Sequence, residues 1–218
     1  MQPEACAAAG EALPVEAIGG ATDSTVREGA MEGVLHVVGE GGYRVASVRA
    51  VLEYSGGHRR QFYENFESLE DCFAQACAAW IEQLGLNLLE AAVGVEGWRS
   101  QVRAALTRLF QLVVEKPEIA RALFVEVHVA GGRALAAHDE GVERFARALD
   151  SVREELGPDA APPRETGTFV VGGIEAYLCE VLSEGSPERI WDGLPEVMRM
   201  VVGAYLDPQA AQEEAEKR

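Results

Sequence analysis

Positive charge is scarce in this chain, which has 19 Lys and Arg residues against 36 Asp and Glu residues and a formal net charge of −17. Such a balance argues against loose, nonspecific binding of the whole surface to nucleic acid or another polyanion. Any contact with nucleic acid must come from a small, locally basic face. With 218 residues, 48% of them hydrophobic, the chain is long enough for one sizeable domain or two modest ones.

Cysteine is also rare, and its four positions lack both the density of a disulfide framework and the Cys-x-x-Cys spacing of a metal site. They are Cys6, Cys72, Cys77 and Cys179. No histidine cluster accompanies them, so we expect no metal and no cofactor. Cys72 and Cys77 fall inside an apolar helical pattern, which favours buried thiols in a reducing cytosol. A thiol redox sensor is the alternative.

Long apolar runs are missing: none approaches the roughly 18 to 20 residues that a membrane-spanning helix needs. The first 24 residues contain no Lys or Arg, and they lack the positive region and continuous apolar stretch of a signal peptide. We therefore expect a cytoplasmic protein without a membrane partner. It should have a disordered acidic tail over residues 1–24 and a polar C-terminal tail over residues 208–218.

Helical periodicity, by contrast, is present almost everywhere, and no segment keeps the alternating period of a strand. In residues 25–39, apolar side chains recur at i, i+4, i+7 and i+8, and a glycine-rich run ends that helix. Two short helices follow over residues 47–53 and 59–65. Between them, the tight turn Ser55–Gly57 uses glycine, which takes positive φ without steric cost. This arrangement predicts a helix-turn-helix over residues 25–70.

Longer amphipathic stripes fill residues 71–207, and most of their apolar positions are simply core. Ser68, followed three residues later by Asp71, has a spacing like that of a capping box. Pro117 suits the first turn of another helix. The sequence thus predicts an all-α chain, in which the helix-turn-helix is followed by a helical body.

Several residues in the segment 25–73 have a spacing that resembles the DNA-binding domain of the tetracycline-repressor-like (TetR) family of bacterial transcription regulators. They are Gly42-Tyr43, Ser47-Val48, Gly56, Phe62-Tyr63, Phe66, Ser68 and Glu70. The segments KPEIARALFVEVHVAGG and VVGAYLDPQAA resemble the family's ligand-binding and dimerisation region more loosely. The resemblance implies a homodimer that binds a palindromic operator in double-stranded DNA, acts as a repressor, and is released by a small, mainly hydrophobic inducer.

The resemblance also makes residues 59–65 the recognition helix, which enters the major groove. Cations at a helix N-terminus oppose the helix dipole, so two adjacent arginines there favour contact with DNA over a solvated helix start. Arginine and glutamine both suit paired hydrogen bonds to base edges, while a serine or tyrosine hydroxyl suits phosphate. The expected DNA-binding residues are Arg44, Ser47, Arg49, His58, Arg59, Arg60, Gln61 and Tyr63.

Three departures from the family pattern bear on operator affinity. Gly57 stands in place of a buried Val-like residue, His58 in place of a Ser or Thr cap, and Leu69 in place of a Lys that contacts phosphate. Residues 24–71 also contain eight acidic residues against five arginines. We therefore expect a modest operator affinity that falls sharply with salt.

The resemblance places an inducer pocket among the middle helices. Its expected walls are Trp80, Leu84, Trp98, Leu106, Phe110, Phe124, His128, Phe145 and Phe169. His128 is either a hydrogen-bonded core histidine or a ligand contact. Glu126 is either paired within the protein or, if unpaired, an attraction for a cationic ligand.

A dimer face is expected on the last two long helices. Its residues are Val170, Gly173, Tyr177, Val181, Val197, Met198, Val201 and Tyr205, and the alternative for them is packing within one chain. Two other functions stay open for the whole protein. One is a helical small-molecule-binding protein with weak or lost DNA affinity. The other, an enzyme, has little support, since the sequence shows no paired carboxylates, metal spacing or nucleophile–base constellation.

Overall fold

In the computed structural model, residues 23–156 and 162–216 are described, and every regular element among them is helical. The predicted all-α fold is therefore confirmed. The expected acidic tail lies outside the described residues except for Asp23 and Ser24, which begin the first helix. Within the described ranges, no helix combines the length and the apolar character that crossing a bilayer requires.

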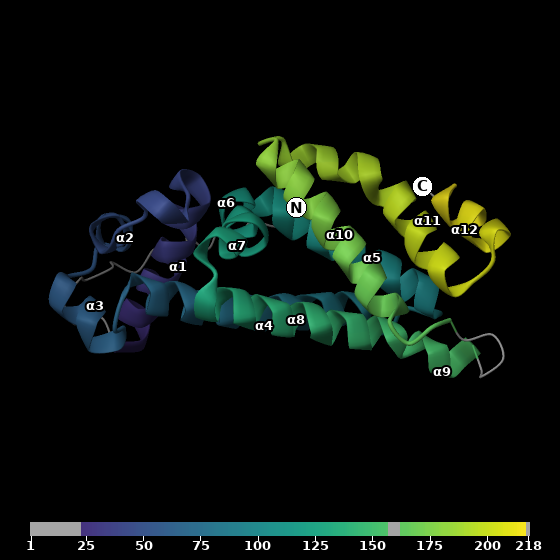
Figure 1. Cartoon of the computed structure of the whole chain (residues 1–218), viewed down its shortest axis with the longest axis horizontal. Helices are drawn as coiled ribbons and strands as arrows, with labels where there is room; N and C mark the ends of the chain where they lie inside the picture. The colour runs from purple at the N-terminus through teal and green to yellow at the C-terminus, as the bar shows by residue number, and fades with distance from the viewer. Residues whose placement is uncertain (1–22, 157–161, 217–218) are drawn as a thin grey trace, which may run out of the picture.

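The N-terminal head contains α1 (Asp23–Gly41), the short 3-10 turn η1 (Tyr43–Val45), α2 (Val48–Ser55) and α3 (Arg59–Asn65). These elements gather at one end of the molecule (Figure 1). Gly56 follows α2 with a φ of 68°, a left-handed conformation that favours glycine, and it turns the chain into α3. The predicted helix-turn-helix is confirmed, although α2 begins one residue later and ends two residues later than expected.

Apolar side chains of the three head helices form one core with the start of α4 (Leu69–Ala92). Val34 and Val38 of α1, Val51 of α2 and Phe62 of α3 are each at most 1% exposed. Burying one such side chain contributes about 1.5–3 kcal/mol, so this cluster fixes the position of α3. Because α4 continues unbroken into the body, the expected domain boundary falls on the first turn of a single helix.

The body consists of long helices joined by short ones. The long ones after α4 are α5 (Trp98–Glu115), α8 (Gly132–Asp150), α10 (Thr166–Ser183) and α11 (Leu194–Tyr205). The short ones are α6 (Pro117–Arg121), the π-helical turn η2 (Ala122–Glu126), α7 (Val127–Ala130), α9 (Val152–Leu156), the 3-10 segment η3 (Pro187–Gly193) and α12 (Pro208–Ala215).

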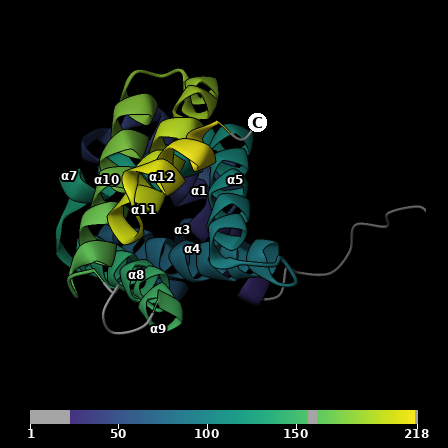
Figure 2. The same ribbon diagram turned by 90° about the vertical axis from the view of Figure 1, so that its right-hand side faces the viewer.

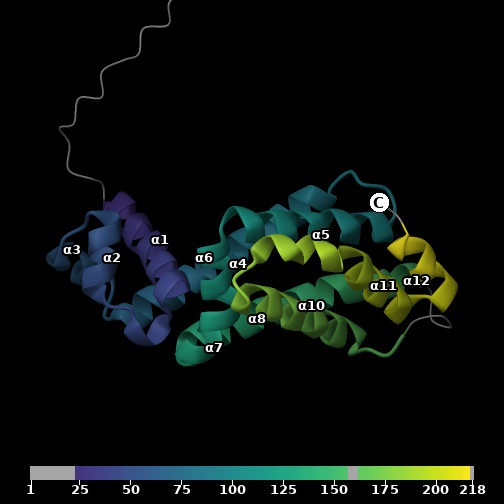
Figure 3. The ribbon, with the colours of Figure 1, turned by 90° about the horizontal axis from the view of Figure 1, so that it is seen from above.

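Two layers make up this body. α4 and α8 run side by side along the long axis (Figure 1). α5, α10 and α11 stand over them, as the end view in Figure 2 and the top view in Figure 3 show. A second apolar core lies between the layers and includes Phe110, Leu178 and Met198, each at most 2% exposed.

The head meets the body where α1 packs on α6, and Gly39 makes the close approach possible. A Cβ at position 39 would overlap the backbone carbonyl of Glu118. The expected end of the first helix within the glycine-rich run is confirmed, although α1 continues two residues beyond the expected 25–39, to Gly41, and the turn follows at Gly42, which has a φ of 91°. Helix–helix contact, and not a turn, accounts for Gly39.

The expected polar C-terminal tail is also wrong over residues 208–215, which form α12. The side chain of Asp207 caps its start by accepting hydrogen bonds from two backbone N–H groups. Glu214 is 1% exposed, and Oε1 of its carboxylate accepts hydrogen bonds from Arg103 of α5 at 2.8 and 3.0 Å. This buried ion pair ties α12 to the body, and the acidic composition of the segment concealed it.

Cys72 and Cys77 are fully buried in the head core. Burial raises the pKa of both thiols to about 12, so neither forms the thiolate that redox chemistry requires. The interpretation of these two residues as small buried hydrophobes is confirmed.

Candidate DNA-binding face and ligand cavity

α3 turns one face into the head core and the opposite face to solvent. Phe62 packs against Phe66, with ring centroids 5.3 Å apart. Arg59, Arg60 and Tyr63, at positions i, i+1 and i+4, lie together on the outward face, and all three are exposed. The guanidinium of Arg59 lies 5.6 Å from the centre of the Tyr63 ring, close enough for a cation–π contact.

Two of the expected arginines pair with glutamates of their own helices. The Nε atom of Arg60 lies 2.8 Å from Oε1 of Glu64 on α3, and that of Arg49 lies 2.8 Å from Oε1 of Glu53 on α2. Exposed pairs with this spacing contribute about 0.3–0.5 kcal/mol. A phosphate or a base can therefore displace the glutamates readily, although their negative charges remain near the face.

Gln61 is placed differently from the arginines beside it. Its side chain is half-buried, and its Oε1 accepts a hydrogen bond of 3.3 Å from the backbone N–H of His58. A glutamine three residues after the cap residue commonly satisfies that N–H group. Gln61 thus stabilises the start of α3 in this structure, a role that its spacing from His58 already indicates in the sequence.

Ser47 caps α2, since its Oγ accepts a hydrogen bond of 3.3 Å from the backbone N–H of Ala50. Its hydroxyl hydrogen is still able to donate to a phosphate oxygen. Arg44 on η1, Arg49 on α2 and His58 before α3 are exposed as well. Apart from Gln61, all the expected DNA-binding residues are accessible, and their contact with DNA stays a prediction.

A cavity of about 130 Å³ lies in the body between α4, α5, α8, α10 and η2. Its wall is apolar except for His138 of α8 and Glu175 of α10. Apolar cavities of roughly this size hold molecules such as benzene. The chemistry available here is the binding of a small apolar molecule, with polar groups confined to one side.

Four of the expected wall residues line this cavity: Leu84, Leu106, Phe124 and Phe145. The remaining five do not. Trp80 and Trp98 line two neighbouring depressions, which share some walls with the cavity. Phe110 is fully buried beside Trp191, with ring centroids 5.7 Å apart. His128 stands outside the lining, and Phe169 is 79% exposed.

Several aliphatic wall residues and both polar ones were not expected from the sequence. Ile81 and Leu88 flank Leu84 at helical spacing on α4, and Ile174 and Leu178 are four residues apart on α10. Their helical spacing is visible in the sequence. However, a helix packed on two sides has two apolar faces, and the period of the apolar residues does not show which face lines a cavity. His138 and Glu175 come from different helices, so no spacing relates them.

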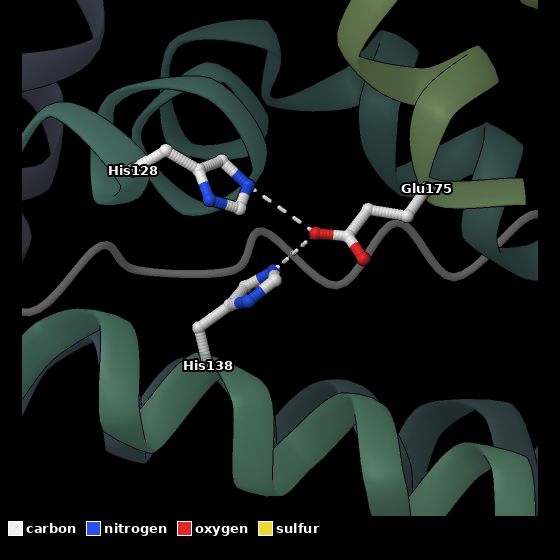
Figure 4. A group of neighbouring side chains, drawn as sticks. All are labelled: His128, His138 and Glu175. Atoms are coloured by element: carbon white, nitrogen blue, oxygen red, sulfur yellow. Dashed lines mark ion pairs between the residues drawn. The ribbon is translucent and has the colours of Figure 1, made fainter. Parts of the chain in front are cut away.

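Three polar side chains lie close together (Figure 4), and two of them, His138 and Glu175, also line the cavity. Nε2 of His128 on α7 lies 3.3 Å from Oε1 of Glu175, and Nε2 of His138 lies 3.2 Å from the same oxygen. His138 is 2% exposed, whereas the side chain of His128 is 45% exposed. The expectation of no metal rested on spacing in the sequence, which gives no indication of this grouping.

The π-helical turn η2 joins the cavity to the head. Leu123 and Phe124 of this turn line the cavity. Glu126, at its end, accepts hydrogen bonds from the backbone N–H of Tyr43 at 2.9 Å and from Arg121 at 2.7 Å. Glu126 is 6% exposed, so the alternative of a Glu126 paired within the protein is confirmed. One turn of helix therefore contacts both the cavity and the chain segment that precedes α2.

Several solved structures share this architecture. A TetR family transcription regulator from Marinobacter aquaeolei VT8 aligns with a TM-score of 0.65 at 18% identity, over 84% of this chain and 96% of the other. The transcriptional regulator FadR from Bacillus subtilis, in complex with stearoyl-CoA, aligns with a TM-score of 0.71 at 14% identity, over 81% and 98%. RolR, in complex with resorcinol, aligns with a TM-score of 0.61 at 16% identity, over 90% and 95%.

The chain has the TetR fold. No protein-family model and no curated protein sequence matches it, and at these identities the structural likeness establishes the fold alone.

Within this TetR fold, the residues expected at a dimer face are used inside the chain. Six of them are at most 6% exposed and belong to the body core: Val170, Val181, Val197, Met198, Val201 and Tyr205. A Cβ on Gly173 would lie 3.0 Å from Sδ of Met200 on α11. The hydroxyl of Tyr177 donates to the backbone carbonyl of Ile190 at 3.1 Å. For these residues, the alternative of packing within one chain describes the structure.

Proposed function

We propose that the chain is a ligand-responsive transcription regulator, a repressor that binds its operator through α3 as a homodimer. The observation that carries this proposal is the outward face of α3, where Arg59, Arg60 and Tyr63 are exposed on a helix anchored from behind by the head core. A helix that projects from the end of a domain fits the major groove of DNA. In an acidic protein, a local basic face is unusual, and attraction to the phosphates and bases of an operator would explain it.

Reading a palindromic operator requires two heads related by a twofold axis. We infer that the dimer contact lies on the outward side of α10 and α11, where Phe169, Gly172, Ala176 and Met200 are exposed. The α10 positions follow i, i+3 and i+7, so they lie on one helix face. Phe169 is 79% exposed, and an apolar stripe left open to solvent is typical of an interface.

The ligand inferred for the cavity is small and mainly apolar. A volume of about 130 Å³ is below the roughly 300–1,000 Å³ of most ligand pockets, so a ligand larger than one ring would have to move the helices apart. The structural neighbour RolR is in complex with resorcinol, a single ring, and FadR with stearoyl-CoA. Without expansion, the cavity is closer in size to a single ring such as resorcinol than to stearoyl-CoA.

Release of the operator would pass through η2. A ligand that displaces Leu123 or Phe124 moves the turn that also carries Glu126, and Glu126 holds the backbone N–H of Tyr43 before α2. A shift there changes how the head sits on the body. Ligand and operator should then disfavour each other by about 1–3 kcal/mol, the usual size of such coupling.

A second function, ligand binding without useful DNA affinity, is favoured by one observation. Arg49 and Arg60 are each paired with a glutamate on the same helix, so the proposed DNA face carries compensating negative charge. If the negative charge of the head repels the DNA phosphates, the cavity is the functional site of the protein.

The two functions separate in a binding assay with the full chain and duplex DNA from the region upstream of its own gene. The regulator is expected to give a discrete complex at low salt that survives excess random-sequence DNA, weakens steeply as salt rises, and dissociates when a cavity ligand is added. Apolar ring compounds can be screened first by the fluorescence of the tryptophans. Compounds that bind the protein, together with an absence of any sequence-selective complex, would support the second function instead.

A further inference from the structure

The cluster of His128, His138 and Glu175 is composed of side chains that bind transition metals. The ligand atoms, one ring nitrogen of each histidine and a carboxylate oxygen of the glutamate, all lie within 4.8 Å of one another. They come from α7, α8 and α10 and converge on one point (Figure 4). Two imidazoles and one carboxylate form a donor set that is well suited to zinc.

Two of the three separations between these atoms fit a tetrahedral ion. With metal–ligand bonds of about 2.0–2.1 Å, the ligands of a tetrahedral site lie about 3.3 Å apart. The two distances from Glu175 Oε1 to the histidine nitrogens are 3.3 and 3.2 Å. His128 can adjust the third separation, because its side chain is 45% exposed and α7 is a short helix.

Nε2 of His138 supplies an independent observation. The residue is 2% exposed, yet this nitrogen has no hydrogen-bond partner within the described residues. Glu175 Oε1 is near enough at 3.2 Å, so it is the direction of the ring nitrogen that misses the oxygen. A buried ring nitrogen that lacks a hydrogen-bond partner, and that lies within 4.8 Å of a carboxylate oxygen and a second imidazole nitrogen, is available as a ligand to a metal ion that the three groups share.

The other ring nitrogen of His138 faces a second carboxylate. Nδ1 lies 3.5 Å from Oδ1 of Asp139. A carboxylate on this side favours the tautomer with its proton on Nδ1, which leaves Nε2 free as a ligand, and metal-binding histidines commonly have such a partner. The glutamate and aspartate charges together also balance a divalent cation.

We propose that His128, His138 and Glu175 bind a divalent transition-metal ion of the zinc type. Three protein ligands leave a fourth coordination position open, as in catalytic rather than structural zinc sites. His138 and Glu175 also line the apolar cavity, so the open position is at the polar side of that cavity. The half-exposed His128 provides the route by which the ion enters from solvent. This inference does not depend on whether the chain binds DNA.

Metal titration of the untagged full chain, first stripped with a chelator, tests the proposal. Co²⁺ is the probe because its visible absorption reports coordination by protein ligands, and Zn²⁺ is then added in competition. One Co²⁺ should bind per protomer, Zn²⁺ should displace it, and the Tm should rise with Zn²⁺ concentration. Saturation at micromolar metal with this stoichiometry is the expected result.

The variants assign the site. His128→Ala leaves the buried residues in place, so it should fold, and its dissociation constant for Zn²⁺ should be at least about tenfold higher. Glu175→Gln should have a similar effect. His36→Ala is the matched control, because His36 also pairs with a glutamate, Glu40, at 3.4 Å, and it should bind metal like the wild type. Absence of saturable binding by the wild type, or unchanged affinity in both His128→Ala and Glu175→Gln, would overturn the proposal.

Discussion

Replacing Glu126 with glutamine should weaken the junction between head and body. The amide oxygen of the glutamine could still accept the hydrogen bond from the backbone N–H of Tyr43, which is 2.9 Å long in the wild type. It would lose the charged bond to Arg121, now 2.7 Å long, and would present an amide N–H₂ to a guanidinium. Because Glu126 is 6% exposed, water does not readily replace the lost partner.

The size of this effect follows from the type of bond. A hydrogen bond to a charged group contributes about 1.5–3 kcal/mol to stability. For a chain of this length, each kcal/mol shifts the Tm by about 2–4 °C, so a fall of roughly 3–12 °C is expected. Glu115→Gln is the matched control. Glu115 lies 3.4 Å from Arg108 and its side chain is 55% exposed, so a change below about 0.5 kcal/mol is expected.

Urea unfolding at a fixed protomer concentration measures both variants, since dimerisation would make the apparent stability depend on concentration. Glu126→Gln should also reduce the coupling between ligand and operator, because the contact between η2 and Tyr43 is loosened. Equal unfolding free energies for Glu126→Gln and Glu115→Gln would refute the assignment of Glu126 as the link between cavity and head.

Three further outcomes are expected. Phe169→Asp should convert the dimer into a monomer in sedimentation, whereas Val93→Asp, a change at a residue that is 70% exposed on another surface, should not; a wild type that sediments as a monomer would remove the interface. Gly39→Ala should lower the free energy of unfolding by at least about 1–3 kcal/mol through overpacking. Gly29→Ala on the same helix is the control, because a Cβ there meets only Ser55 at an ordinary contact distance of 3.8 Å, so it should be neutral or stabilising; thermal melts compare the two. Burial alone raises the pKa of the Asp71 carboxyl, but hydrogen bonds and a nearby arginine lower it below its usual value. Its contribution is therefore present above the unfolded pKa of about 3.9 and lost as pH falls below it, so Asp71→Asn should be less stable at pH 7 and should flatten the acid limb of the stability curve.

The head was largely predictable from the sequence because its signals are local. A glycine at the turn, a serine at each of two helix starts, and phenylalanines four residues apart each act within one or two helical turns. The boundaries of α3 followed from these signals and agree with the structure. Gln61 shows the limit of this reasoning, since its type suits a base contact and its spacing suits a cap, and the structure has the cap.

The body was less predictable because its signals are contacts between distant segments. Val170 and Met198 were assigned to a dimer face as bulky apolar residues on the last two long helices, but each is buried against other helices of its own chain. Phe169, expected in the cavity, is on the outer surface. When a helix has neighbours on several sides, the packing angles between the helices decide which neighbour an apolar residue contacts. The sequence period does not give these angles. His138 and Glu175 meet only through the fold, so no motif could reveal their pairing.

The central claim is that the exposed face of α3 binds an operator, and operator affinity of recognition-helix variants tests it most directly. Fluorescence anisotropy at low salt should compare the binding of the wild type, Arg59→Ala and Arg60→Ala to an operator found in the DNA upstream of the protein's own gene. Arg147→Ala serves as control, because it removes another exposed arginine that also pairs with a glutamate on its own helix. Each α3 variant should bind about 1–3 kcal/mol more weakly, with a Tm that changes by no more than about 2 °C, and the control should match the wild type. Operator binding that is the same for all four proteins would contradict the claim.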